Sequence, residues 1–306
     1  MPPGATTSCD AQDARTRFID EFFEAKPPSK SYRELRESAI RMGVVQAEPD
    51  GANTDEALKK GQLAAREVLA ALRNAGLSAS ARSLLDLGCG DGSTTVSLAE
   101  LLGVPPERRL GLEYESTADV PSPRPPVSDD FCFALYTDHP APALPCTFDI
   151  RLPPQTRLSS GGGPPPDQFD EVRNPSTPDY PLHVRDGSFD VVTAFRSLHH
   201  ISPAGLTVVL REVVRVLKVG GIFIVKEHDC LDETFSHFLD KVHHFKQHIS
   251  QPGGEREMYT KYESCASWQR IIEDAGLMRV HAEECQGSLL RDVIIIFKKE
   301  SDGSSR

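Results

Sequence analysis

The chain lacks several features that would assign it to common classes of protein. No apolar stretch approaches the roughly 20 residues that span a bilayer, so no membrane span is expected. No run of Lys or Arg appears and the net charge is −11, so binding to DNA or another polyanion is not favoured. The N-terminus has no charged-then-apolar signal layout. The seven cysteines include no C-x-x-C pair, which indicates reduced thiols in a cytoplasmic protein.

The length and the uneven composition indicate one main domain with two irregular regions. The chain has 306 residues, enough for one large domain or two small ones. We expect residues 1–54 to form an N-terminal tail and a helical cap, and residues 55–306 to form the main domain. Residues 139–182 contain Gly161-Gly-Gly-Pro-Pro-Pro166, which cannot pack a core, and we interpret this range as a flexible surface insertion.

Short apolar runs alternate with segments of helical periodicity along the main domain. This alternation predicts an α/β fold with a doubly wound, mostly parallel sheet. The last two strands are joined by a short linker, which suggests an antiparallel hairpin at one edge. The expected helices cover residues 55–75, 93–102, 203–216, 234–249 and 267–275, and the expected strands cover residues 83–87, 110–113, 131–137, 189–195, 222–226, 278–282 and 293–297.

The most informative segment reads Leu84-Leu-Asp-Leu-Gly-Cys-Gly-Asp-Gly92. Its apolar start predicts a buried strand of a parallel sheet. The alternate glycines allow a sharp turn with positive φ and leave no Cβ between the backbone and a ligand. The turn carries two acids, Asp86 and Asp91, and no Lys, so it suits a ligand with a cationic or hydroxyl-rich part better than a phosphate.

This segment resembles motif I, D-x-G-x-G-x-G, of the class I S-adenosylmethionine (SAM)-dependent methyltransferases. Asp86, Gly88, Gly90 and Gly92 match the motif in register. The third glycine comes one residue too early for the dinucleotide pattern G-x-G-x-x-G, so a dinucleotide oxidoreductase is the weaker alternative. The resemblance implies SAM as the cofactor and a seven-stranded, mostly parallel sheet with an antiparallel edge strand.

Two later blocks extend the resemblance over residues 83–298. Asp186-Gly-Ser-Phe-Asp-Val-Val192 with Leu198-His-His-Ile201 is similar to the family's fourth-strand block. Leu217-Lys-Val-Gly-Gly221 is similar to its helix-to-strand turn, with Val219 in place of the common Pro. The Leu-His-His-Ile form is frequent in the quinone-biosynthesis, or type 11, methyltransferases and in some RNA-modifying ones.

Ligands of open α/β sheets bind at the carboxyl ends of the strands, which selects the candidate cofactor residues. Glu113 ends the second strand, where a carboxylate can accept hydrogen bonds from both vicinal hydroxyls of a ribose. By the resemblance, Asp138 would bind the adenine amino group. The candidate cofactor residues are Asp86, Gly88, Cys89, Gly90, Gly92, Glu113, Asp138 and Arg196.

Ionisable residues that follow the fourth and fifth strands are the candidate catalytic groups. A hydroxyl or amine acceptor must lose a proton, and His titrates near working pH. His199 and His200 follow the fourth strand, and Glu227 and His228 follow the fifth. Polar groups in such positions are costly to bury unless they are paired or used. The alternative for each is an ordinary cap or packing role.

A metal site is not expected from the sequence. His244 and His248 are four residues apart on an expected helix and could share a metal ion, with His228, Cys230, His237 and His243 nearby. No C-x-x-C or H-E-x-x-H pattern accompanies them, and methyl transfer needs no metal ion.

The sequence leaves the methyl acceptor open between a small molecule and RNA, and it leaves the oligomeric state open. The 2′-O-ribose RNA methyltransferases use a Lys-Asp-Lys-Glu tetrad. Lys226 matches its fifth-strand Lys and Asp292 could replace the final Glu, but Phe195-Arg196 stands where an Asp is required. A further alternative is a catalytically inactive SAM-fold module that serves as a partner subunit.

Overall fold

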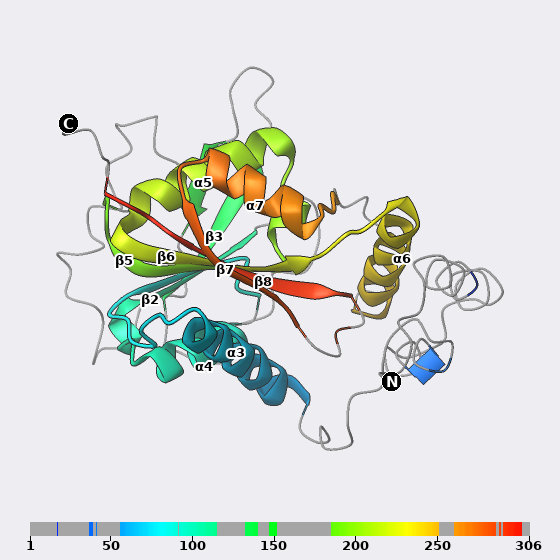
Figure 1. Ribbon diagram of the computed structural model, residues 1–306, viewed down its shortest axis with the longest axis horizontal. Coiled ribbons are helices and arrows are strands. Elements are labelled where there is room, and N and C mark those ends of the chain that lie inside the picture. Colours follow the sequence, from blue (N-terminus) through cyan, green and yellow to red (C-terminus); the bar gives the residue numbers. More distant parts are fainter. Residues whose placement is uncertain are drawn as a thin grey trace, which may run out of the picture.

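The protein is built in three layers, with a mixed sheet between two layers of helices. The computed structural model describes residues 17, 37–38, 41, 56–90, 92–114, 132–139, 147–151, 185–250, 260–285, 288 and 290–301. Helices α5 (Pro203–Val216) and α7 (Cys265–Asp274) cover one face of the sheet, and α3 (Glu56–Asn74) and α4 (Ser93–Leu102) cover the other (Figure 1). Helix α6 (Glu233–Ser250) lies beyond the end of the sheet where β6 finishes (Figure 1).

The sheet has eight strands in the order β4-β3-β2-β1-β5-β6-β8-β7. Strands β3, β2, β1, β5 and β6 run parallel, β4 is antiparallel to β3, and β8 is antiparallel to both β6 and β7. The bounds are β1 Leu84–Leu87, β2 Arg109–Tyr114, β3 Cys132–His139, β4 Thr147–Arg151, β5 Phe189–Phe195, β6 Leu217–His228, β7 Met278–Glu284 and β8 Asp292–Lys298, with short 3₁₀ turns η2 (Pro106–Arg108) and η4 (Leu198–His200).

The alternating α/β architecture is confirmed, whereas the expected strand count and edge are not. The additional strand is β4, which lies inside the range expected to form an insertion and pairs with β3. The hairpin of β7 and β8 forms as expected, but β8 inserts between β6 and β7, so the antiparallel strand lies one position in from the edge. Either strand of a hairpin can pair with the neighbouring strand of a sheet. The sequence alone therefore does not distinguish the order β6-β8-β7 from the order β6-β7-β8.

Apolar residues on both faces of the sheet divide the core into two clusters. In β8, Val293, Ile295 and Phe297 join the cluster beneath α5 and α7. Ile294 and Ile296 join the cluster beneath α3 and α4. Successive side chains of a strand point to opposite faces, so a strand covered on both faces is apolar at every position.

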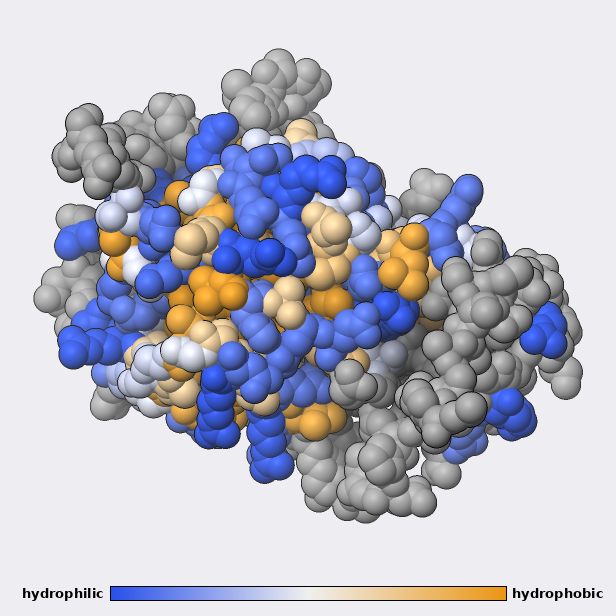
Figure 2. Space-filling model, viewed as in Figure 1, coloured by the Kyte–Doolittle hydropathy of each residue, from blue (hydrophilic) through white to orange (hydrophobic). Residues whose placement is uncertain are grey.

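Most of the N-terminal range, residues 1–54, lies outside the described residues, so the expected helical cap stays a prediction. Among the described helices, none combines the length and the apolar character needed to cross a membrane. Figure 2 shows that hydrophilic side chains cover most of the face in view and that apolar side chains lie between them in separate small groups.

We predict that Ile295→Ala lowers the free energy of unfolding by about 2–5 kcal/mol, because it removes a fully buried side chain from the middle of the sheet and leaves a cavity. Urea denaturation followed by circular dichroism measures the change. Val219→Ala is the control, because Val219 is 64% exposed and its truncation leaves stability nearly unchanged. Equal stability of the two variants would contradict the packing of β8.

Candidate active site

The turn after β1 has the backbone that its glycines predict. Gly88, Gly90 and Gly92 have φ values of +71°, +58° and +77°, in the left-handed region that L side chains rarely adopt. A Cβ at Gly88 would lie 2.4 Å from the Cβ of Ser197, whereas beside Gly90 the space is open to 4 Å. The loop therefore packs tightly on the exit of β5 on one side and leaves room beside Gly90 on the other.

Asp86 holds this turn in place. Its carboxylate is 2% exposed and accepts a hydrogen bond from Thr193 on β5 at 2.7 Å and another from Thr95 on α4 at 2.5 Å. Both carboxylate oxygens are thus engaged by hydroxyl groups of the protein. Among the candidate cofactor residues, Asp86 ties together the strand, the helix and the neighbouring strand that surround the loop.

The other candidate cofactor residues lie on the neighbouring strand ends. Gly88 and Cys89 both donate their backbone N–H to the carbonyl of Leu112, so Glu113 on β2 directly follows the residue that anchors the loop. Asp138 lies near the end of β3. The side chains of Glu113 and Asp138, and the whole of Asp91, lie outside the described part of the structure.

Arg196 stands at the exit of β5 with a φ of +53°, and its N–H donates to the carbonyl of Lys226 at 2.6 Å. This turn starts η4 and directs the following residues away from the sheet. The Ser197 hydroxyl donates to the carbonyl of Leu87 at 2.9 Å, which joins the β5 exit to the glycine turn.

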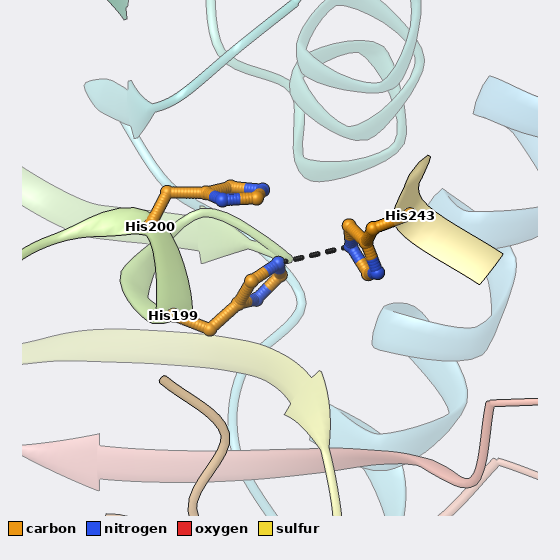
Figure 3. Close-up of side chains that lie close together, drawn as sticks. All are labelled: His199, His200 and His243. Atoms are coloured by element: carbon orange, nitrogen blue, oxygen red, sulfur yellow. Dashed lines mark hydrogen bonds between the residues drawn. The ribbon is translucent and has the colours of Figure 1, made fainter. Parts of the chain in front are cut away.

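A buried His–carboxylate pair lies just beyond this turn. His199 is 1% exposed, and its Nδ1 lies 2.6 Å from Oε2 of Glu227. The second oxygen of Glu227 accepts the N–H of Leu198 at 2.8 Å. The opposite ring nitrogen of His199, Nε2, lies 3.1 Å from Nε2 of His243 on α6, and the ring of His200 stands beside both (Figure 3).

A second buried His–carboxylate pair lies beside the first. His228 is 1% exposed, and its Nδ1 lies 2.8 Å from Oδ1 of Asp292 on β8. Its Nε2 is buried and has no hydrogen-bond partner among the described residues. The ring centroids of His228 and His199 are 5.0 Å apart. Two imidazoles with the same kind of partner thus stand side by side at the ends of β5 and β6.

The electrostatics of the two pairs keep both carboxylates ionised. Burial on its own raises the pKa of Glu227, but the interactions with His199 and the backbone N–H of Leu198 outweigh burial and bring that pKa below its usual value. Burial also opposes ionisation of Asp292, and the hydrogen bond from His228 and the charge of Arg196 lower its pKa well below the usual range. Burial lowers the pKa of His228, which favours its neutral, proton-accepting form.

Lys226 precedes these residues and is itself paired. Its ammonium group lies 2.5 Å from a carboxylate oxygen of Glu67 on α3 and 4.0 Å from Oδ2 of Asp292. The two residues that match part of the 2′-O-ribose tetrad, Lys226 and Asp292, are therefore neighbours. Arg196 remains in the place of the required Asp.

The structure brings all four candidate catalytic residues into one cluster, together with three further residues. His199, His200, Glu227 and His228 lie together, with Asp292, His243 and Tyr262 around them. Asp292 faces His228 because β8 pairs with β6 in this register. The only sequence signal for that contact would have been an acid at the start of a strand next to β6, and the strand order was open.

A separate groove of about 540 Å³ opens between α5 and α7. Leu206, Leu210, Trp268 and Ile271 form much of its wall. None of the candidate cofactor or catalytic residues lines it. The groove is therefore distinct from the histidine cluster, which consists of His199, His200, His228 and His243.

A comparison with protein-family models finds a match in the second half of the chain. Residues 172–225 match a family model described as a methyltransferase domain, a span that includes β5, η4 and α5 and leaves out the glycine turn. A search of curated proteins finds no match.

Several solved structures resemble the fold at low sequence identity. One is the complex between the Haloferax volcanii Trm112 methyltransferase activator and a methyltransferase, with 14% identity, 80% of this chain and 92% of that chain covered, and a TM-score of 0.47. A SAM-dependent methyltransferase from Thermotoga maritima has 16% identity, coverage of 79% and 94%, and a TM-score of 0.42. One from Methanosarcina mazei has 14% identity, coverage of 76% and 97%, and a TM-score of 0.42.

We predict that Gly88→Ala destabilises the protein more than Gly90→Ala does. Both variants force an L residue into the left-handed region, at about 1–2 kcal/mol each. Only Gly88→Ala also meets the Cβ of Ser197, which adds roughly 1–3 kcal/mol of steric cost. Urea unfolding measures both free energies.

The double variant Gly88→Ala, Ser197→Gly is the matched test of that contact. Removal of the Ser197 Cβ should recover part of the stability lost in Gly88→Ala, a coupling that a double-mutant cycle measures directly. Equal losses in Gly88→Ala and Gly90→Ala, with no coupling to Ser197, would show that the turn does not pack on the β5 exit in this way.

Proposed function

We propose that this chain, which carries a class I SAM-dependent methyltransferase domain of the type 11 group, methylates an acceptor that binds beside the histidine cluster. The cofactor of the domain is S-adenosylmethionine. The observation that carries the proposal is the turn of Gly88, Gly90 and Gly92 after β1, which joins the exit of β5 through Ser197. That contact brings a cofactor turn and a cluster of ionisable groups to the same end of the sheet.

The residues around the turn fit SAM. Open space beside Gly90 admits a ligand close to the backbone. Glu113, on the strand that anchors the turn, would accept hydrogen bonds from the ribose hydroxyls, and Asp138 on the next strand would bind the adenine amino group. SAM supplies a methyl group on a positively charged sulfur, so positioning of the acceptor provides much of the rate.

Methylation of a hydroxyl or an amine also requires removal of a proton from the acceptor. We assign its removal to His228, because its Nε2 is buried and without a partner among the described residues while Nδ1 faces the Asp292 carboxylate. A carboxylate only accepts hydrogen bonds, so Nδ1 carries the ring proton and Nε2 keeps its lone pair. The proton of an acceptor hydroxyl or amine would move to Nε2 as the bond to the methyl group forms. Tyr262, whose ring packs beside His199, His228 and His243, would shape the acceptor pocket.

One labelling experiment identifies the class of methyl acceptor. Purified protein is incubated with methyl-labelled SAM and fractionated cell extract. Label in small molecules supports a metabolite acceptor, and label in RNA supports the RNA alternative. SAM binding without transfer to any fraction supports an inactive SAM-binding module, and absence of SAM binding overturns the enzyme proposal.

We predict that Glu113→Ala weakens SAM binding about 10- to 100-fold, because hydrogen bonds to a charged group are each worth about 1.5–3 kcal/mol. Calorimetric titration with SAM measures the affinity. Glu107→Ala is the matched control, since Glu107 is an exposed acid at the opposite end of β2 and should leave the affinity unchanged. Equal affinities of the two variants would refute the assignment of Glu113 to the ribose.

We predict that Asp292→Asn lowers kcat roughly 10²- to 10⁴-fold for the acceptor found by labelling while SAM affinity stays near wild type. The amide can present its N–H to His228 and stabilise the wrong tautomer, which removes the lone pair from Nε2.

Glu212→Gln is the control for this variant, because it also neutralises a buried acid, one that is paired with Arg215 away from the cluster. It should lose stability and keep its turnover per folded molecule. Full turnover in Asp292→Asn would exclude His228 as the proton acceptor.

A further inference from the structure

The nitrogen atoms of the histidine cluster have an arrangement that neutral imidazoles alone do not explain. Nδ1 of His199 faces the carboxylate of Glu227 at 2.6 Å, and Nδ1 of His243 faces the carbonyl of Leu239 at 3.0 Å. Both of these partners only accept hydrogen bonds, so each Nδ1 carries the proton of its ring. If both rings are neutral, Nε2 of His199 and Nε2 of His243 then each carry a lone pair and no proton.

These two lone pairs point at one another. Nε2 of His199 and Nε2 of His243 are 3.1 Å apart, and Figure 3 shows the two rings meeting across the gap between η4 and α6. Two facing lone pairs repel at this distance unless a positive charge lies between them. The positive charge is either an extra proton shared by the rings or a metal ion bound by both.

The third ring favours the metal ion. His200 offers a ring nitrogen such that the donor atoms of His199, His200 and His243 all lie within 4.8 Å of one another. A shared proton needs two nitrogens and gives His200 no part, whereas a metal ion binds all three. In a tetrahedral zinc site with Zn–N bonds of about 2.1 Å the nitrogens are about 3.4 Å apart, so the His199–His243 pair at 3.1 Å already has nearly this spacing.

The surroundings are those of a metal-binding histidine. Ligating imidazoles usually donate their second N–H to a carboxylate or a backbone carbonyl, and His199 and His243 show one case of each. The acidic side chains of Glu227 and Asp292 also lie buried beside the cluster, each within hydrogen-bond distance of a histidine Nδ1. The buried Nε2 of His228, without a partner among the described residues, and the ring of Tyr262 stand beside the same cluster.

We propose that His199, His200 and His243 bind a divalent transition-metal ion of the Zn²⁺ class, with Glu227 as the group that orients His199. Imidazole ligands suit Zn²⁺ and its neighbours, and three protein ligands leave a position for water or for a donor atom of the methyl acceptor. The sequence predicted no metal site, because it contains no C-x-x-C or H-E-x-x-H pattern. The proposed site instead combines histidines from η4 and α6. The metal site deepens the proposed function at the same cluster, but it is tested without SAM or acceptor.

The test is calorimetric titration of the full chain with Zn²⁺ after removal of bound metal by a chelator. We expect one equivalent to bind tightly in the wild type. His243→Ala and His200→Ala should weaken binding roughly 100-fold or more, and Glu227→Gln roughly 10- to 100-fold. His237→Ala is the control, because His237 is an exposed histidine on α6 outside the cluster and its loss should leave the affinity unchanged.

Thermal unfolding gives a second readout that separates lost binding from lost folding. Saturating Zn²⁺ should raise the melting temperature of the wild type and of His237→Ala, and leave that of His200→Ala unchanged. His200 is only half-buried, so its variant is expected to fold and decides the matter if His243→Ala does not.

Two results would overturn the proposal. No saturable binding in the wild type would leave a shared proton between His199 and His243 as the explanation of their contact. Undiminished binding in both His243→Ala and His200→Ala would place the metal ion elsewhere, for example on the cysteines. Because neither the titration nor the thermal unfolding contains SAM, a failure of methyl transfer leaves both results interpretable.

Discussion

The carboxylate of Asp86, buried between two threonine hydroxyls, is the contact on which the rest of the active region depends. It joins β1 to β5 through Thr193 and joins β1 to α4 through Thr95. Strands β1 and β5 are the neighbours at which the order of the sheet reverses, and ligands of open α/β sheets bind at that reversal. A buried charge is stable only with such partners, so the position of the turn is strongly specified.

From that contact the structure extends stepwise to the histidines. The turn places Gly88 against Ser197, Ser197 bonds back to Leu87, and the chain then enters η4, where His199 and His200 lie. The buried pairs His199–Glu227 and His228–Asp292 come from three different strand ends and add ionised groups to the interior. Pairs of this kind contribute little to stability compared with apolar packing, so their presence in the core agrees better with a chemical role.

The local features of the fold could be predicted from the sequence, whereas several long-range contacts could not. The helices and most strands follow from periodicity, and the turn at Gly88 follows from its glycines, because both depend on neighbours in the chain. The place of β8 depends on which strand edge its hairpin meets, and Asp292 could not be paired with His228 before that was known. His243 was visible as one of several histidines on a helix, but only the packing of α6 distinguishes it from His237. Strand β4 was not predicted, because its two apolar residues, Phe148 and Ile150, are flanked by Pro-rich sequence.

The central place of β8 also constrains the order in which the protein can be assembled. Strand β8 follows β6 and β7 in the chain and is synthesised after them, yet β6 and β7 each pair with it and not with one another. Until residues 292–298 are available, β6 has an open hydrogen-bonding edge of strongly apolar character, and β7 has no partner among the described strands. A nascent chain that lacks β8 would expose an edge that can pair with other chains.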